Sequence, residues 1–168
     1  IPGNDVQRWV KDWNVRHDFL LASQYRQLAV AMLSTHDTTN WKAWWQYEAG
    51  TVDEGLFIRK GKERGIDFAK VSLELFDLHF SFYGRLRWKK EIDCVDKLLR
   101  ILGRKNEEVK DFIELYENSY SEKEKLWKLL GLSGAVTQEA SADLLFRIIK
   151  FVLDSKSIFC VNLIVDYL

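Results

Sequence analysis

One short segment constrains the fold of this chain more than any other. Residues 28–34, LAVAMLS, form a continuous apolar run that stops at a polar cluster. An apolar run of this length without alternation predicts a strand buried on both faces, as in parallel sheets covered by helices. Two further segments, DVQRW at 5–9 and SIFCVNLIV at 157–165, also have strand-like composition. Helix-type patterns separate the three segments, so we expect parallel βα units and an α/β fold.

Helical patterns fill most of the remaining chain, without a sequence repeat or a low-complexity linker. The helices that we expect lie at 52–63, 68–83, 88–102, 106–118, 122–130 and 140–153. The residues at 51–54, TVDE, predict a capping box, and Gly131 predicts a helix end. Three parallel strands with unpaired edges do not make a finished sheet. We therefore expect residues 1–168 to be a single partial domain, mostly helical, with a helix-rich section from about 66 to 153.

The loop after the apolar run is where we expect the functional residues. In barrels of βα units, the residues that do chemistry follow the carboxyl ends of the strands. Thr35, His36 and Asp37 follow the run directly, and a Thr-Thr-Asn run after them can cap the next helix. Asp37 is therefore expected to project into a cleft. A plainer interpretation stays open, in which Asp37 only caps the helix and His36 is a hydrogen-bonded residue at the rim.

Three tryptophans follow this cluster at helical spacing. Trp41, Trp44 and Trp45 fall on one face of the expected helix. Aromatic side chains at this spacing pack in a core more often than they form platforms for sugars, although one ring can do both. Both roles stay open for these rings at this point.

Composition argues against several classes of function. The chain has 25 basic and 25 acidic residues, so it lacks the excess of positive charge that is typical of nucleic-acid binding. No apolar run approaches the roughly 18 residues that a membrane span needs. Cys94 and Cys160 have no metal-ligand spacing, and we expect both to be buried free thiols in a reducing compartment. We therefore expect a cytoplasmic protein that binds neither nucleic acid nor membrane and uses no metal or cofactor.

Three segments, in order, resemble one enzyme family. IPGNDVQRWVKDWN at 1–14, LSTHDTTNWKAWW at 33–45 and SIFCVNLIVDYL at 157–168 are similar to the C-terminal part of the 4-alpha-glucanotransferases. These are the amylomaltases or disproportionating enzymes of glycoside hydrolase family 77. The Thr-His-Asp motif with the tryptophans after it is the specific part of the resemblance. It implies the last three strands of a (β/α)8 TIM-type barrel with a large helical insertion, completed by a missing N-terminal part of the same enzyme.

The resemblance also implies an activity and a set of site residues. The family transfers segments of α-1,4-glucan, as in maltooligosaccharides, starch or glycogen, by a retaining mechanism through a covalent glycosyl-enzyme. Asp37 matches the catalytic aspartate that stabilises the transition state, and His36 matches the sugar-binding histidine beside it. Thr35 and Trp44 are further substrate-binding candidates. The motifs for the nucleophile and the general acid/base have no match in this chain, so we expect the isolated chain to be inactive.

Two other functions are kept as alternatives. A His-Asp pair is also typical of helical, metal-dependent phosphohydrolases. Their divalent metal ligands would here be drawn from His17, His36, Asp37, Asp77 and Asp93. The position of the pair after a strand, rather than within a helix, argues against this function. The second alternative is a non-enzymatic helical interaction module whose aromatic faces bind a partner.

Overall fold

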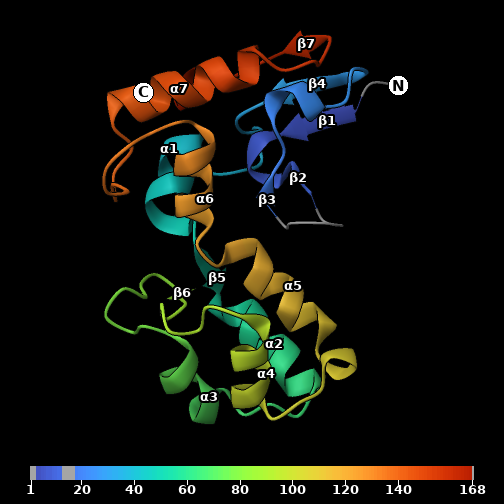
Figure 1. The fold of residues 1–168 in the computed structure, drawn as a ribbon, viewed down its shortest axis with the longest axis vertical. Coiled ribbons are helices and arrows are strands. Elements are labelled where there is room, and N and C mark those ends of the chain that lie inside the picture. Colours follow the sequence, from blue (N-terminus) through green and yellow to red (C-terminus); the bar gives the residue numbers. More distant parts are fainter. Residues whose placement is uncertain (1–2, 13–17, 168) are drawn as a thin grey trace. The chain divides into compact units, whose positions relative to one another are not determined.

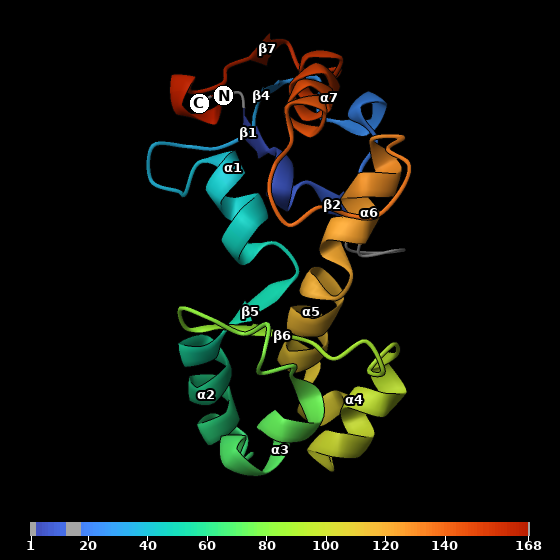
Figure 2. The same ribbon diagram turned by 90° about the vertical axis from the view of Figure 1, so that its left-hand side faces the viewer.

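The computed structural model describes residues 3–12 and 18–167. The chain forms two compact units, which are described separately (Figure 1, Figure 2). Unit 1 is made of two stretches of the chain, Ile1–Tyr47 and Lys123–Leu168. Unit 2 is the continuous stretch between them, Glu48–Glu122. The helix-rich section that we expected therefore includes parts of both units.

Unit 1 contains a parallel three-stranded sheet in the order β1-β4-β7. Its strands are β1 (Gly3–Val6), β4 (Ala29–Met32) and β7 (Phe159–Cys160). Ala31 of the central strand lies opposite Asp5 on one side and Cys160 on the other. Ala29 and Ala31 are fully buried, whereas Val30 and Met32 on the other face are half-buried, so the expected burial of both faces is confirmed only in part. The expected parallel arrangement of the three segments is confirmed.

The outer strands differ from their expected bounds. β1 ends before a 3-10 turn, η1 (Gln7–Trp9), which had been expected to continue the strand. β7 is short, although the sequence predicts a strand over 157–165. Directly after β7, Val161 N donates a hydrogen bond to Ala31 O of β4 over 3.0 Å. The next hydrogen bond to this segment comes from a side chain, because Asn162 Oδ1 accepts from Leu33 N over 3.0 Å. The chain then turns into a 3-10 helix, η5 (Ile164–Asp166).

Helix α7 (Ala142–Leu153) packs against the central strand of this sheet (Figure 1). Leu144, Ile148 and Val152 are fully buried, at the spacing of one helix face. Apolar residues also occur outside this face, and Phe146 is 67% exposed. A helix that is apolar on several sides is typical of one that further protein covers.

The remaining elements of unit 1 and its borders are short. They are β2 (Lys11–Asp12), β3 (Asp18–Phe19), η2 (Ala22–Gln24), α1 (Trp41–Ala43), the π-helical turn η3 (Trp44–Glu48) and α6 (Glu122–Leu129). The helix expected at 122–130 is confirmed as α6. Gly131 follows it with a left-handed φ of 66°, the conformation that glycine adopts most easily at a helix end.

Unit 2 is built around an aromatic core. Its elements are β5 (Thr51–Asp53), α2 (Glu54–Glu63), α3 (Phe68–Leu75), β6 (Arg85–Arg87), α4 (Val95–Leu102), η4 (Asn106–Glu108) and α5 (Lys110–Ser119). Phe57 is fully buried and makes edge-to-face contacts with Phe76, Phe112 and Trp88. Figure 2 shows the helices α2, α3 and α4 of this unit below the antiparallel pair of β5 and β6, with α5 beside the pair. The buried rings therefore join most elements of unit 2 in one cluster.

The antiparallel pair of β5 and β6 was not expected from the sequence. Val52 lies opposite Leu86 in this pair. Before β6, Tyr83 and Gly84 both have positive φ, 53° and 71°, which is the geometry of a tight two-residue hairpin turn. Such a turn cannot lie within a helix. The expectation of a helix over 68–83 is therefore wrong beyond α3.

The other helix predictions for unit 2 are confirmed in part. The helix expected at 88–102 begins only at α4, and the one expected at 106–118 is divided into η4 and α5. Helix α2 is found within its expected range, but its cap is Asp53, whose Oδ1 accepts a hydrogen bond from Leu56 N over 2.6 Å. Thr51, the expected cap, lies in β5.

None of the helices in the described part of the chain has the length and apolar character that crossing a membrane requires.

The two cysteines are free thiols, as expected, but they are not both buried. Cys94 is exposed and Cys160 is half-buried. Cys94 is the residue before α4, where its backbone is extended and its side chain lies outside the helix. The expectation of two buried thiols is therefore wrong.

Candidate functional site

A tight turn carries the predicted His-Asp pair of unit 1. Thr38 N donates a hydrogen bond to Thr35 O over 3.1 Å, and Thr35 N donates to the Thr38 hydroxyl over 3.0 Å. His36 and Asp37 are the two central residues of this turn. Their side chains are 85% and 79% exposed, and His36 Nε2 lies 3.1 Å from Asp37 Oδ2. The turn thus presents an imidazole and a carboxylate to solvent. The cleft into which Asp37 was expected to project stays a prediction.

Asp166 binds both ends of the loop that contains this turn. We refer to residues 34–41 as the site loop. The Ser34 hydroxyl donates to the two carboxylate oxygens of Asp166 over 2.6 and 2.7 Å, and Trp41 N donates to Asp166 Oδ1 over 2.8 Å. All three residues are at most 1% exposed. A buried carboxylate is stable only when its oxygens are hydrogen-bonded, and these donors provide the bonds. The site loop is therefore closed at its base.

Arg8 and Asn162 hold the same region from two other segments of the chain. Arg8 Nη1 donates to the Thr39 hydroxyl over 3.1 Å, and Nη2 donates to the Thr39 carbonyl oxygen over 2.7 Å. The Arg8 guanidinium also lies over the ring of Trp44, 5.2 Å from its centroid. Asn162 accepts its hydrogen bond from Leu33, directly before the site loop. The loop is thus fixed by side chains from both ends of the sequence.

The three tryptophans form a packed support for the site loop. The rings of Trp41 and Trp45 are stacked, with centroids 5.6 Å apart and an interplanar angle of 15°. Trp41 Nε1 donates a hydrogen bond to the buried Gln7 Oε1 over 2.8 Å. Trp44 is 5% exposed and has Arg8 over its ring. Their burial agrees with a packing role, and contact between Trp44 and a sugar stays a prediction.

The structure places three of the predicted site residues together. Thr35, His36 and Asp37 lie in one turn at the carboxyl end of β4. The cap of the next helix is Asn40, whose Oδ1 accepts a hydrogen bond from Ala43 N over 2.8 Å. The interpretation in which Asp37 only caps that helix is therefore wrong.

The residues that hold the site loop were not expected from the sequence. Arg8 stands in a segment that had been expected to be a strand, and Asp166 stands in an end segment, outside the specific part of the resemblance. Their partners lie 31 and 132 positions away, so no local pattern connects them. One signal was present for Asp166, which is a single acidic residue that follows an apolar run. A charge in such a place needs hydrogen-bond donors if it is buried.

The geometry does not favour the metal-dependent alternative. The described residues contain no group of three or more His, Cys, Asp or Glu side chains that could hold a metal ion. Of the ligands considered, His17 lies outside the described residues, and Asp77 and Asp93 belong to unit 2. His36 and Asp37 belong to unit 1, where they lie in a turn and not within a helix.

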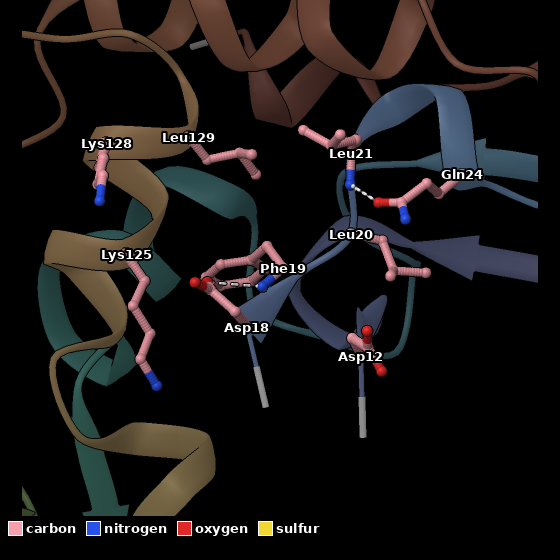
Figure 3. A pocket seen from close by; sticks show the side chains of 9 residues that line it. All are labelled: Asp12, Asp18, Phe19, Leu20, Leu21, Gln24, Lys125, Lys128 and Leu129. Carbon is pink, nitrogen blue, oxygen red and sulfur yellow. Dashed lines mark hydrogen bonds between the residues drawn. The ribbon is translucent and has the colours of Figure 1, made fainter. Parts of the chain in front are cut away.

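A separate cavity of about 670 Å³ lies elsewhere in unit 1 (Figure 3). It is bounded by the ladder of β2 and β3, by the turn after β3 and by helix α6. Phe19, Leu20 and Leu129 give it apolar walls, and Lys125 and Lys128 line it from α6. None of the residues around it belongs to the site loop. This cavity is therefore distinct from the predicted site.

Comparison with known proteins identifies one family. The family model described as 4-alpha-glucanotransferase matches residues 1–168. A curated 4-alpha-glucanotransferase of Chlamydia muridarum (strain MoPn / Nigg) is 39% identical over 46 residues, which are 27% of this chain and 9% of that protein. The match therefore spans less than a tenth of the length of this relative. No solved structure matches the chain.

Proposed function

The chain belongs to the 4-alpha-glucanotransferase family, and we propose that it is the part of such an enzyme that carries the transition-state-stabilising aspartate, Asp37. The complete enzyme transfers segments of α-1,4-glucan from one glucan to the 4-hydroxyl of another. Its substrates are maltooligosaccharides and longer α-1,4-glucans. The mechanism is retaining, with a covalent glycosyl-enzyme between the two transfer steps.

One observation carries this proposal, which is the fixed turn that presents His36 and Asp37 side by side. Retaining transfer passes through a state in which the sugar ring resembles an oxocarbenium ion. A carboxylate accepts hydrogen bonds from sugar hydroxyls that are about twice as strong as neutral ones. Because the turn is held in place before substrate binds, Asp37 needs little reorganisation to stabilise that state. His36 donates a hydrogen bond to the same sugar.

Other parts of the enzyme supply the nucleophile and the general acid/base in this proposal. Retaining glycosyl transfer needs two carboxyl groups about 5 Å apart on either side of the scissile bond. The site loop carries Asp37 as its one carboxylate. The turn is also open to water, whereas transfer to a glucan requires that water be kept from the covalent intermediate. A surface beyond the described residues must therefore face the turn.

The sheet of unit 1 supports the same proposal. Within the described residues, β1 and β7 each pair with β4 alone, so each has one open edge. Ile158, Phe159 and Val161, in and beside β7, are each more than half exposed. In a (β/α)8 barrel, further strands pair with both edges and cover such side chains. We propose that these strands come from an N-terminal part of the same polypeptide.

The substitution Asp37→Asn in the full-length enzyme tests the proposal. It removes the charge and keeps the shape, so the melting temperature should stay at the parent value. The kcat for transfer from maltotriose should fall by roughly 10²-fold or more. Asp154→Asn is the matched control. It changes another exposed carboxylate of unit 1, which is paired with Lys150, and should keep full activity.

Two outcomes would contradict this proposal. A kcat of Asp37→Asn within about twofold of the parent would show that Asp37 does not contact the reacting sugar. The 168-residue chain alone should form no product from maltotriose. Product formation by this chain would show that it already contains the nucleophile and the general acid/base.

A further inference from the structure

We propose that Asp166 is a positioning residue for the His36 and Asp37 pair, acting through the site loop whose two ends it binds. This inference rests on the proposed function of that pair and adds a residue to which the resemblance gives no role. Asp166 is fully buried, whereas the side chains of the pair are mostly exposed. Its effect on the reaction therefore passes through the backbone of the site loop.

The hydrogen bonds of Asp166 join two points that frame the turn. Ser34 is the residue directly before the turn, and Trp41 is the first residue of α1. Both donate to the same carboxylate, over 2.6 to 2.8 Å. Residues 35–40 lie between these two points. When both ends of so short a segment are fixed, few conformations remain for it.

The position of Asp166 is explained by these hydrogen bonds better than by packing. The first amides of a helix have no acceptor within the helix. Asn40 caps α1 by accepting from Ala43 N, and Asp166 accepts from the Trp41 amide. A carboxylate is costly to bury, so an apolar residue would suit a position that only filled space. The buried charge therefore indicates that holding Ser34 and Trp41 is what the position requires.

Loss of Asp166 should displace the site loop without unfolding it. Arg8 still binds Thr39, so one point of the loop stays fixed. A displacement of about 1 Å at a group that stabilises the transition state can cost up to about 10²-fold in rate. Substrate binding by the other parts of the enzyme should not change. The expected result is a fall in kcat with little change in KM.

Two substitutions of Asp166 in the full-length enzyme separate loop closure from charge. Asp166→Ala removes both hydrogen-bond acceptors, and its kcat should fall by about 10- to 100-fold with KM within about threefold. Asp166→Asn can accept from Trp41 N with its oxygen and donate to the Ser34 hydroxyl with its nitrogen. The kcat of Asp166→Asn should therefore stay close to that of the parent enzyme and well above that of Asp166→Ala. Val152→Ala, at a fully buried position of α7, controls for a loss of stability alone and should keep its kcat.

Hydrogen exchange in the 168-residue chain gives a second test that does not depend on glucan transfer. In Asp166→Ala, the amides of residues 35–41 should exchange roughly tenfold faster than in the parent chain. Peptides from unit 2 should be unchanged. The control Val152→Ala should not accelerate exchange selectively in the site loop.

Several results would overturn this inference. Unchanged exchange of the site loop in Asp166→Ala would do so, and so would full kcat of the same variant. Equal losses of kcat in the Ala and Asn variants would show that charge, and not loop closure, is what matters. If the parent enzyme transfers no glucan but the loop exchanges faster as expected, the proposed function fails while the positioning of the loop by Asp166 is supported.

Discussion

The two units of this chain differ in where their large apolar side chains lie. Sixteen such side chains are exposed among the described residues, and twelve of them belong to unit 1. Many of the twelve lie in α7, in β7 and in the residues after β7. Unit 2 buries a cluster of rings around Phe57, although Phe80 and Tyr83 are exposed. Exposed apolar side chains in consecutive segments mark a surface that other protein covers. Unit 2 therefore has its own aromatic core, whereas the exposed apolar side chains of unit 1 support the proposal that further strands cover it.

The two units also differ in which of them holds the predicted site residues. The site loop, which carries Thr35, His36 and Asp37, belongs to unit 1, and so does Trp44. Within the described residues, the sheet of this unit has open edges. Unit 2 contains none of the predicted site residues. Under the proposed function, this site depends on other parts of the enzyme for further strands and for the nucleophile and the general acid/base. A unit with its own core has no such dependence.

The largest expected effects come from the two aromatic cores. Phe57→Ala in unit 2 and Trp45→Ala in unit 1 each remove a fully buried ring. Each should lower the free energy of unfolding of its own unit by about 3–5 kcal/mol. Trp88 is the one tryptophan of unit 2, and the other six belong to unit 1. Fluorotryptophan NMR during urea unfolding can therefore follow each unit, with Trp88→Phe to assign the signal of unit 2.

If the two units are independent, each variant should move one set of signals. Phe57→Ala should lower the urea midpoint of the Trp88 signal and leave those of unit 1 in place. Trp45→Ala should do the reverse. A common shift of all signals in both variants would mean that the chain unfolds as one unit, and the contrast between a complete and an incomplete unit would be lost.

Helix caps should give a smaller effect, about 1 kcal/mol for replacement of an Asn or Asp cap by Ala. Asn40 caps α1 at the end of the site loop, and Asp53 caps α2 in unit 2. Both Asn40→Ala and Asp53→Ala should lower the melting temperature of the chain. In the full-length enzyme, Asn40→Ala should also lower kcat, because its cap fixes the loop that carries Asp37. Equal kcat values for the two variants would show that the site loop does not depend on its cap.

The smallest expected effect concerns the cysteines, one in each unit. Cys94 is exposed, whereas Cys160 lies half-buried in β7, where desolvation raises the pKa of its thiol. A raised pKa leaves less thiolate near pH 8, so Cys160 should react with iodoacetamide roughly threefold or more slower than Cys94. The difference should decrease as the pH rises through that pKa. Mass spectrometry of the variants C94S and C160S measures the two rates. Faster labelling of Cys160 would mean that β7 is detached from β4 in solution.

Local patterns were sufficient for elements whose residues are buried in a regular order. The strand expected at 28–34 and the helix expected at 140–153 are found as β4 and α7. One is apolar on both faces, and the other repeats apolar residues at helical spacing after a good cap, Ser141. The place of the site loop also followed from the sequence, because it comes directly after a buried strand.

Features that depend on distant residues were not predictable in this way. The pair of β5 and β6 joins short strands with two helices between them, and three residues are too few to show an alternating pattern. Arg8 and Asp166 became part of the site only through hydrogen bonds to Thr39, Ser34 and Trp41. Nothing in their local sequence indicates these partners. The sequence thus indicated which residues lie in the exposed turn but not which residues hold it.

Hydrogen exchange of the 168-residue chain, combined with size-exclusion chromatography, tests most directly whether unit 1 is incomplete. The open edges of β1 and β7 leave backbone groups and apolar side chains without cover in the described structure, and such edges promote self-association. We predict that the amides of β1, β4 and β7 exchange sooner than those of α2 and α5, and that the chain elutes as more than a monomer. A monodisperse monomer whose three strands are among its best-protected segments would contradict the claim that unit 1 needs further strands.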